Sequence, residues 1–264
     1  MNLEDEDMDH IFHCEVKPGL YILCDDRQSP TDDPKSLVPG KPTGNSYLVV
    51  GSEKAILLDL ALDNKSLKEY AENLAGVPVQ LVLSHAHVDH IYHITQFPEV
   101  WLHPDDEKLL RHGAVFQRPV KNCPPLHFLR DGEIIDLGNR ILDVIHLPGH
   151  TDGSILLIDR NTRTLLGGDT VARHLLHGMH TKIPPEEIIR RMEALKDLHF
   201  DTIYCTHDRC SLPKSHIDLI QEVLRRYPIE GKLQTIPLLT KIRTFSIGAQ
   251  KELHYCDVAA VEHK

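Results

Sequence analysis

The sequence lacks any Cys-x-x-Cys pair, any apolar run long enough to cross a membrane, and any excess of basic residues. Its six cysteines are scattered, which favours free thiols in a reducing compartment over a disulfide framework. No stretch approaches 18 consecutive apolar residues, and residues 1–7 are acidic, whereas a secretory signal begins with basic residues. We therefore expect a cytoplasmic protein that is not associated with a membrane.

The overall charge and composition narrow the class of partner. A formal net charge of −10 disfavours a nucleic acid, because phosphate backbones are bound by clustered Lys and Arg side chains. The hydrophobic fraction of 41% and the charged fraction of 26% are typical of a soluble globular protein. We expect a small-molecule substrate, and a homodimer is compatible with the sequence.

The order of the apolar segments predicts two sheets packed together with helices outside. No linker is visible, so we predict one domain over residues 1–264, with a polar, mobile lead-in at 1–13 and a long proline-rich loop at 25–44. Strands are predicted at residues 19–24, 45–50, 54–59, 79–83, 100–103, 133–137, 140–147, 154–159, 164–167 and 201–205, helices at 64–74, 104–112, 185–198 and 214–227, and a closing hairpin at 241–256.

A dense group of metal-ligand side chains follows the apolar run of residues 79–83. The segment of residues 84–90 reads Ser-His-Ala-His-Val-Asp-His. In an extended segment His85 and His87 lie on the same side, so both can reach one cation, while Asp89 and His90 can serve a second. Imidazole and carboxylate donors without cysteine favour zinc, with iron or manganese as alternatives. The competing interpretation is a solvated histidine-rich loop, since the chain has 19 histidines.

Three further candidate ligands lie directly after other predicted strands. His150 follows Leu147-Pro148-Gly149, Asp169 follows Gly167-Gly168, and His207 follows Thr206. Glycines beside two of them would let the backbone crowd a site. A single histidine at a strand end is usually structural, but that explanation must hold independently at each of these positions.

This ordered set of residues resembles the metallo-beta-lactamase superfamily, whose signature is an aspartate at a strand end, His-x-His-x-Asp-His, a Gly-His, an aspartate and a final histidine. The resemblance spans roughly residues 18–210 and implies a four-layer αββα sandwich with two divalent metal ions. It implies that His85, His87 and His150 hold the first metal, that Asp89, His90 and His207 hold the second, that Asp169 bridges them, and that Asp59 orients the cluster without being a ligand.

The sequence departs from the family pattern beside these positions. Leu60-Ala61 replaces the usual Thr-Gly, Tyr92 and His93 replace a small Gly-Gly step, and Thr206 replaces a glycine. The bulkier Tyr92 and His93 should narrow the substrate pocket. His174, His177 and His180 have a spacing of three that would place them near one helical face, where they could touch substrate or a third metal; we place His174 and His177 in the pocket lining. The competing interpretation is a partly exposed histidine-rich helix or loop, and His103 is expected to be structural.

The resemblance implies a metal-dependent hydrolase. A metal-bound water has a pKa of about 7, which makes a nucleophilic hydroxide available between the two ions. Asp89 and Asp169 are the expected catalytic carboxylates, with Asp89 relaying the proton. Among the chemistries of the family we favour hydrolysis of a small thioester, ester or lactone. The alternatives are a β-lactamase-type amide hydrolase, a phosphodiesterase, or a metal-dependent sensor without turnover.

Overall fold

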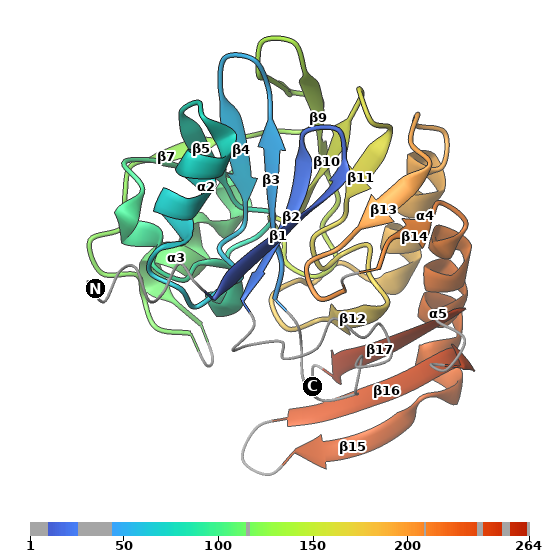
Figure 1. Ribbon diagram of the computed structural model, residues 1–264. Coiled ribbons are helices and arrows are strands. Elements are labelled where there is room, and N and C mark those ends of the chain that lie inside the picture. The colour runs from blue at the N-terminus through green and yellow to red at the C-terminus, as the bar shows by residue number, and fades with distance from the viewer. Residues whose placement is uncertain are drawn as a thin grey trace.

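The structure, a computed structural model, describes residues 10–25, 44–114, 117–208, 210–236, 240–249 and 254–262. Most of its elements belong to two sheets that stand face to face in the centre of the molecule (Figure 1). The helices in the described part are α2 (Leu67–Ala75), α3 (Glu107–His112), α4 (Pro185–Leu195) and α5 (His216–Glu230), with short 3-10 helices η2 (Val88–His90), η3 (Ile94–Gln96) and η4 (Pro104–Asp106).

The two central sheets have simple strand orders. The first has the order β1-β2-β3-β4-β5-β6-β7 and the second the order β14-β13-β11-β10-β9-β8. Strands β4 to β7 run parallel to one another, as do β11 and β13. The first sheet comprises β1 (Ile11–Lys17), β2 (Leu20–Asp25), β3 (Ser46–Val50), β4 (Ala55–Leu58), β5 (Val79–Val82), β6 (Val100–Leu102) and β7 (Leu126–Phe128); the second comprises β8 (Ile134–Asp136), β9 (Ile141–His146), β10 (Ile155–Asp159), β11 (Thr164–Leu166), β13 (Thr202–Tyr204) and β14 (Leu212–Pro213).

The alternation of side chains along the strands produces the layers. In β3, Tyr47 and Val49 belong to the core between the sheets, while Leu48 packs in the core under α2 and α3. In β10, Leu157 faces the first sheet, while Leu156 packs in the core under α4 and α5. Both faces of each central sheet are therefore apolar, and the order helix, sheet, sheet, helix confirms the expected sandwich.

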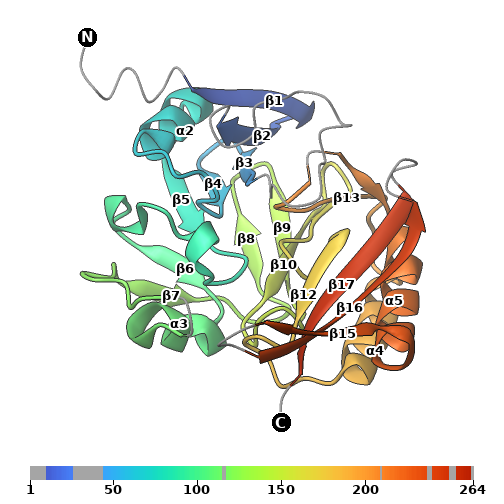
Figure 2. The same cartoon turned by 90° about the horizontal axis from the view of Figure 1, so that it is seen from below.

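A third sheet extends the side that carries α5. It has the order β12-β17-β16-β15, from β12 (His174–His177), β15 (Lys232–Ile236), β16 (Thr240–Ala249) and β17 (His254–Glu262). Cys256, Val258 and Ala260 of β17 join the apolar core under α4 and α5, and β12 and β17 lie side by side in both views (Figures 1 and 2). The hairpin predicted at residues 241–256 is present, with longer strands.

Some predictions need correction. The expected mobile lead-in is wrong at residues 11–13, because Ile11 is buried and residues 11–17 form β1, which pairs with β2. Residues 1–9, and residues 26–43 of the predicted loop, lie outside the described residues. His174 and His177 lie on a strand and not on a helix, so their spacing of three places them on opposite faces. The single domain stays a prediction. Within the described part of the chain, no helix is long and apolar enough to span a membrane.

Candidate metal centre

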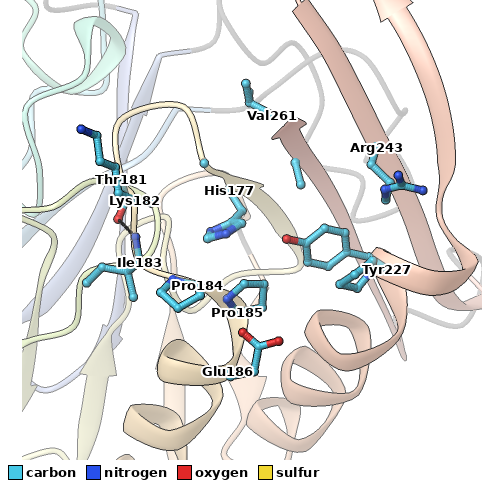
Figure 3. A pocket seen from close by; sticks show the side chains of 13 residues that line it. His177, Thr181, Lys182, Ile183, Pro184, Pro185, Glu186, Tyr227, Arg243 and Val261 are labelled. Carbon is cyan, nitrogen blue, oxygen red and sulfur yellow. Dashed lines mark hydrogen bonds between the residues drawn. The ribbon is translucent and has the colours of Figure 1, made fainter. Parts of the chain in front are cut away.

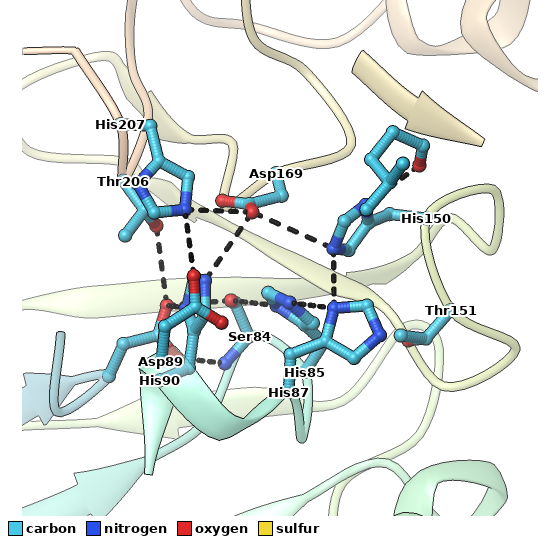
Figure 4. A network of polar contacts seen from close by, with 12 residues as sticks. Ser84, His85, His87, Asp89, His90, His150, Thr151, Asp169, Thr206 and His207 are labelled. Atoms are coloured by element: carbon cyan, nitrogen blue, oxygen red, sulfur yellow. Dashed lines mark hydrogen bonds and ion pairs between the residues drawn. The ribbon is translucent and has the colours of Figure 1, made fainter. Parts of the chain in front are cut away.

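The segments that follow β4, β5, β9, β11 and β13 carry the candidate ligands to one edge of the sandwich. Three imidazoles meet there (Figure 4). Nδ1 of His87 lies 3.1 Å from Nε2 of His85 and 2.7 Å from Nε2 of His150. One ring nitrogen carries at most one proton and cannot satisfy two other nitrogens. This convergence of three nitrogens is the arrangement that a cation would satisfy.

The second group surrounds one carboxylate oxygen. Oδ2 of Asp169 lies 3.1 Å from Nε2 of His207, 3.4 Å from Nε2 of His90 and 3.6 Å from Nε2 of His150. Nε2 of His207 also lies 3.4 Å from Oδ2 of Asp89. Asp169 thus stands between the three-imidazole group and the group of Asp89, His90 and His207, the position that the resemblance implies for a bridging ligand.

Three of the candidate ligand histidines direct their second ring nitrogen to a partner outside the centre. Nδ1 of His90 pairs with Oδ2 of Asp59 at 2.9 Å. Nδ1 of His150 lies 2.8 Å from the carbonyl oxygen of Leu176, and Nδ1 of His85 lies 3.1 Å from Oγ of Ser84. This is the outer-shell pattern of metal-binding histidines, in which the second nitrogen fixes the tautomer and the ring orientation.

The three-imidazole group and the group around Asp169 differ in protonation. Burial lowers the pKa of His87 to about 2 and, with the neighbouring imidazoles, holds the pKa of His85 well below its usual range. Burial also acts on His207, but the Asp169 carboxylate outweighs it and raises the pKa of that imidazole to about 10. The pKa of Asp169 is held well below its usual range by His207 and His90, against the effect of burial. The first group therefore offers neutral ligands, and the second a carboxylate that attracts cations.

The residues present fit a pair of divalent metal ions. Oδ1 of Asp169 is buried and, within the described part of the chain, makes no hydrogen bond, and the buried Nε2 of His90 has only its 3.4 Å ion-pair contact with Oδ2 of Asp169. Buried polar atoms in that state are costly unless a ligand completes them. Neutral imidazoles and ionised carboxylates, with no thiolate among them, are a donor set for zinc, iron or manganese.

Sequence reasoning missed Asp106, which lies in η4. This buried carboxylate accepts hydrogen bonds from the backbone N–H of Ala86 at 2.8 Å, from Oγ1 of Thr151 at 2.9 Å and from the N–H of Gly153 at 2.9 Å. A Cβ atom at Gly153 would lie 2.6 Å from Asp106. Asp106 therefore ties the segment of His85 and His87 to the segment that follows His150.

The structure also brings His180 to the centre, whereas the sequence grouped it with His174 and His177 without a role of its own. Nδ1 of His180 lies 2.6 Å from Nε2 of His87. If Nδ1 of His87 binds metal, its proton lies on Nε2, which then donates to His180. His180 is thus the outer partner of His87. The sequence signal was the histidine-rich run at 174–180, which does not indicate which member reaches the centre.

Truncation of His180 should weaken metal binding. We expect His180→Ala to lower metal affinity by about 10- to 100-fold, the usual cost of losing an outer partner. His180→Asn should recover much of this loss, because its amide oxygen can stand where Nδ1 accepts a hydrogen bond from His87. Competition with a chromogenic chelator measures both variants. Equal affinity in wild type and His180→Ala would show that the contact with His87 has no role.

The four residues predicted to line the pocket lie in different places. Tyr92 is partly buried, and burial together with the charge of Asp89 raises its pKa. Nε2 of His93 lies 2.8 Å from Oδ1 of Asp63. His174 contacts β17, where it pairs with Asp257 at 2.9 Å. His177 lines a cavity of about 360 Å³ between α4, α5 and the third sheet (Figure 3).

The fold and this centre define a class of protein: two-sheet sandwiches that gather histidine and aspartate side chains for divalent metal at one edge. The chain belongs to the metallo-beta-lactamase superfamily, whose model matches residues 39–207.

Curated relatives agree with that membership. The bovine and human proteins named "Acyl-coenzyme A thioesterase MBLAC2" are each 32% identical over 161 residues, which cover 48% of this chain and 58% of theirs. The chain thus spans little more than half the length of these relatives. The "Hydroxyacylglutathione hydrolase GloC" of Haemophilus influenzae is 27% identical over 140 residues, covering 48% of this chain and 66% of that protein.

Solved structures show the same fold. A metallo-beta-lactamase from Pontibacter korlensis matches with a TM-score of 0.64 at 16% identity, over 82% of this chain and 99% of that one. The metallo-beta-lactamase IND-7 matches with a TM-score of 0.62 at 18% identity, over 82% of this chain and 98% of that one. At these identities the likeness establishes the fold alone.

Proposed function

We propose that the chain is a dinuclear metal-dependent hydrolase of a small thioester. The observation that carries the proposal is the position of Asp169, whose Oδ2 lies within 3.6 Å of Nε2 of His90, His150 and His207. A single oxygen in contact with both groups of ligands suits two ions that share a carboxylate, and a structural site for one ion does not require it. His85, His87 and His150 would hold one ion, Asp89, His90 and His207 the other, with zinc the expected metal.

The bound ions would supply a hydroxide at neutral pH and polarise a substrate carbonyl. The chain's own residues would orient the metal ligands and accept the proton. Asp89 is the candidate proton acceptor: its side chain is 45% exposed, and His207 with His90 holds its pKa below the usual range although burial acts against this. The half-exposed carboxylate is therefore ionised at neutral pH and can accept a hydrogen bond from the attacking water and orient it, whereas a low pKa in itself makes a carboxylate a weaker base. Asp59 and His180 would keep His90 and His87 oriented.

The choice of a thioester is supported by a relative. The proteins at 32% identity carry the name of an acyl-coenzyme A thioesterase, and their match includes about half of this chain. Esters and lactones are hydrolysed by the same attack on a carbonyl carbon, and we expect them to be weaker substrates.

A substrate panel tests the proposal. The metal-loaded protein is assayed on acyl thioesters of short and medium chain length, a lactone, a β-lactam and a phosphodiester, before and after treatment with a chelator. We expect kcat/KM to be highest for a thioester, and turnover to disappear with the chelator and return with zinc. Preference for the β-lactam or the phosphodiester would replace the proposed substrate class. Absence of turnover on every compound by the loaded protein would overturn the hydrolase.

A further inference from the structure

A second cluster of metal-ligand side chains lies near Asp106 and outside the centre described above. His103 precedes η4, Asp105 lies within it, and His146 ends β9. Each of the three residues offers one ligand atom, and these atoms all lie within 4.8 Å of one another. Nδ1 of His103 lies 3.6 Å from Oδ2 of Asp105 and accepts a hydrogen bond from the backbone N–H of Asp105 at 3.3 Å, a contact that an ion at Nδ1 would replace. None of the three is among the seven candidate ligands of the dinuclear centre.

The two imidazoles are held side by side. Their rings stack with centroids 3.7 Å apart and planes 10° apart. Nε2 of His146 lies 2.8 Å from the carbonyl oxygen of Asp152, and its backbone N–H donates to Oδ1 of Asp131 at 2.8 Å. A backbone carbonyl as the partner of one ring nitrogen is the outer contact usual for metal-binding histidines, and it leaves Nδ1 of His146 for an ion.

The cluster is also open to solvent on one side. His103 is buried, whereas the Asp105 side chain is 56% exposed and His146 is partly exposed. An ion could enter without the fold opening, which a usable site requires. Neutral imidazole and carboxylate are ligands that zinc and its neighbours accept, and water can fill the remaining position.

We propose that His103, Asp105 and His146 form an accessory site for one zinc-type divalent cation, separate from the dinuclear centre. Zn–N and Zn–O bonds of about 2.0–2.2 Å place the ligands of a tetrahedral ion about 3.3–3.5 Å apart. The donors already lie within 4.8 Å of one another, and the Asp105 side chain, which is 56% exposed, can rotate to bring its carboxylate to that spacing. With three protein ligands and a solvent-facing side, this ion exchanges readily and binds more weakly than those of the dinuclear centre.

Zinc stoichiometry tests the accessory site. Metal-free wild type, His146→Ala, Asp105→Asn and the control His127→Ala are dialysed against the same buffered zinc concentrations, and bound zinc per chain is measured by elemental analysis. His127 is a partly exposed histidine that pairs with Glu99 and lies outside the cluster. We expect wild type and His127→Ala to bind one more zinc at saturation than either cluster variant. Equal saturation in wild type and His146→Ala overturns the proposal.

A second measurement does not depend on substitutions. With zinc added to wild type beyond the amount that fills the dinuclear centre, the ring nitrogen resonances of His103 and His146 should shift together in heteronuclear NMR spectra, while those of His127 stay in place. Unchanged resonances of His103 and His146 would overturn the site. Failure of the dinuclear proposal would look different, because the total zinc would fall in all four proteins while the difference between them persisted.

Discussion

Replacing Asp169 with alanine is expected to abolish hydrolysis while the protein stays folded. The substitution removes the one oxygen that contacts His90, His150 and His207, so both ions would lose a shared ligand. We expect a loss in kcat/KM larger than the ~100-fold that removal of an outer-shell partner can cost, together with the loss of at least one metal ion per chain. Activity assays, elemental analysis and circular dichroism of the purified variant measure the three quantities.

A matched control uses an aspartate that is not part of the centre. Asp201 has a side chain that is 62% exposed and pairs with Arg163, so Asp201→Ala should keep wild-type activity and metal content. An exposed pair of this kind contributes little to stability. Wild-type turnover in Asp169→Ala would contradict the assignment of the bridging ligand.

Asp59→Asn is expected to weaken the second metal position without unfolding the protein. The buried Asp59 accepts hydrogen bonds from the N–H and Oγ of Ser84, each at 2.7 Å, and pairs with Nδ1 of His90 at 2.9 Å. An amide has one oxygen and an NH₂ group, so at least one of these donors loses its acceptor. We expect metal affinity to fall by about 10- to 100-fold, because His90 is no longer held in one tautomer.

The backbone at this position makes asparagine the informative substitution. Asp59 has a φ of 62°, a conformation that asparagine adopts more readily than most residues. Asp59→Asn should cost about 1–3 kcal/mol of unfolding free energy for the unsatisfied buried donor, and Asp59→Ala should cost more, since it leaves all the donors unpaired. Chelator competition measures the affinity and urea unfolding measures the stability. Unchanged metal affinity in Asp59→Asn would show that Asp59 supports the fold alone.

The central sandwich was predictable because its strands are buried on both faces. The apolar runs that predicted β3, β4, β10 and β11 are continuous, as expected for strands covered by a helix layer on one side and a sheet on the other. Five of the described strands were missed: β1, β7, β12, β14 and β15. Strand β1 is mostly exposed beyond Ile11, β7, β12 and β14 have four residues or fewer, and β15 is exposed over the residues whose burial is described, so in each the apolar signal is weak.

The seven candidate ligands were predictable for a different reason. All of them lie in short segments that follow apolar runs, and their order along the chain resembles one family signature. Asp106 and His180 give no such signal. Asp106 looks like an acidic residue at a helix start, and its partners at Ala86, Thr151 and Gly153 are brought to it only by the tertiary fold. Outer partners are therefore found from the structure and not from spacing.

Counting the metal ions tests the central claim most directly. The protein is purified without added metal, dialysed to remove weakly bound ions, and analysed for zinc, iron, manganese and nickel per chain. We predict about two tightly bound ions per chain, most of them zinc, and about one or none in Asp169→Ala. Protein that holds no tightly bound metal, even after reconstitution with each of these ions, would contradict the dinuclear centre and the proposed hydrolase.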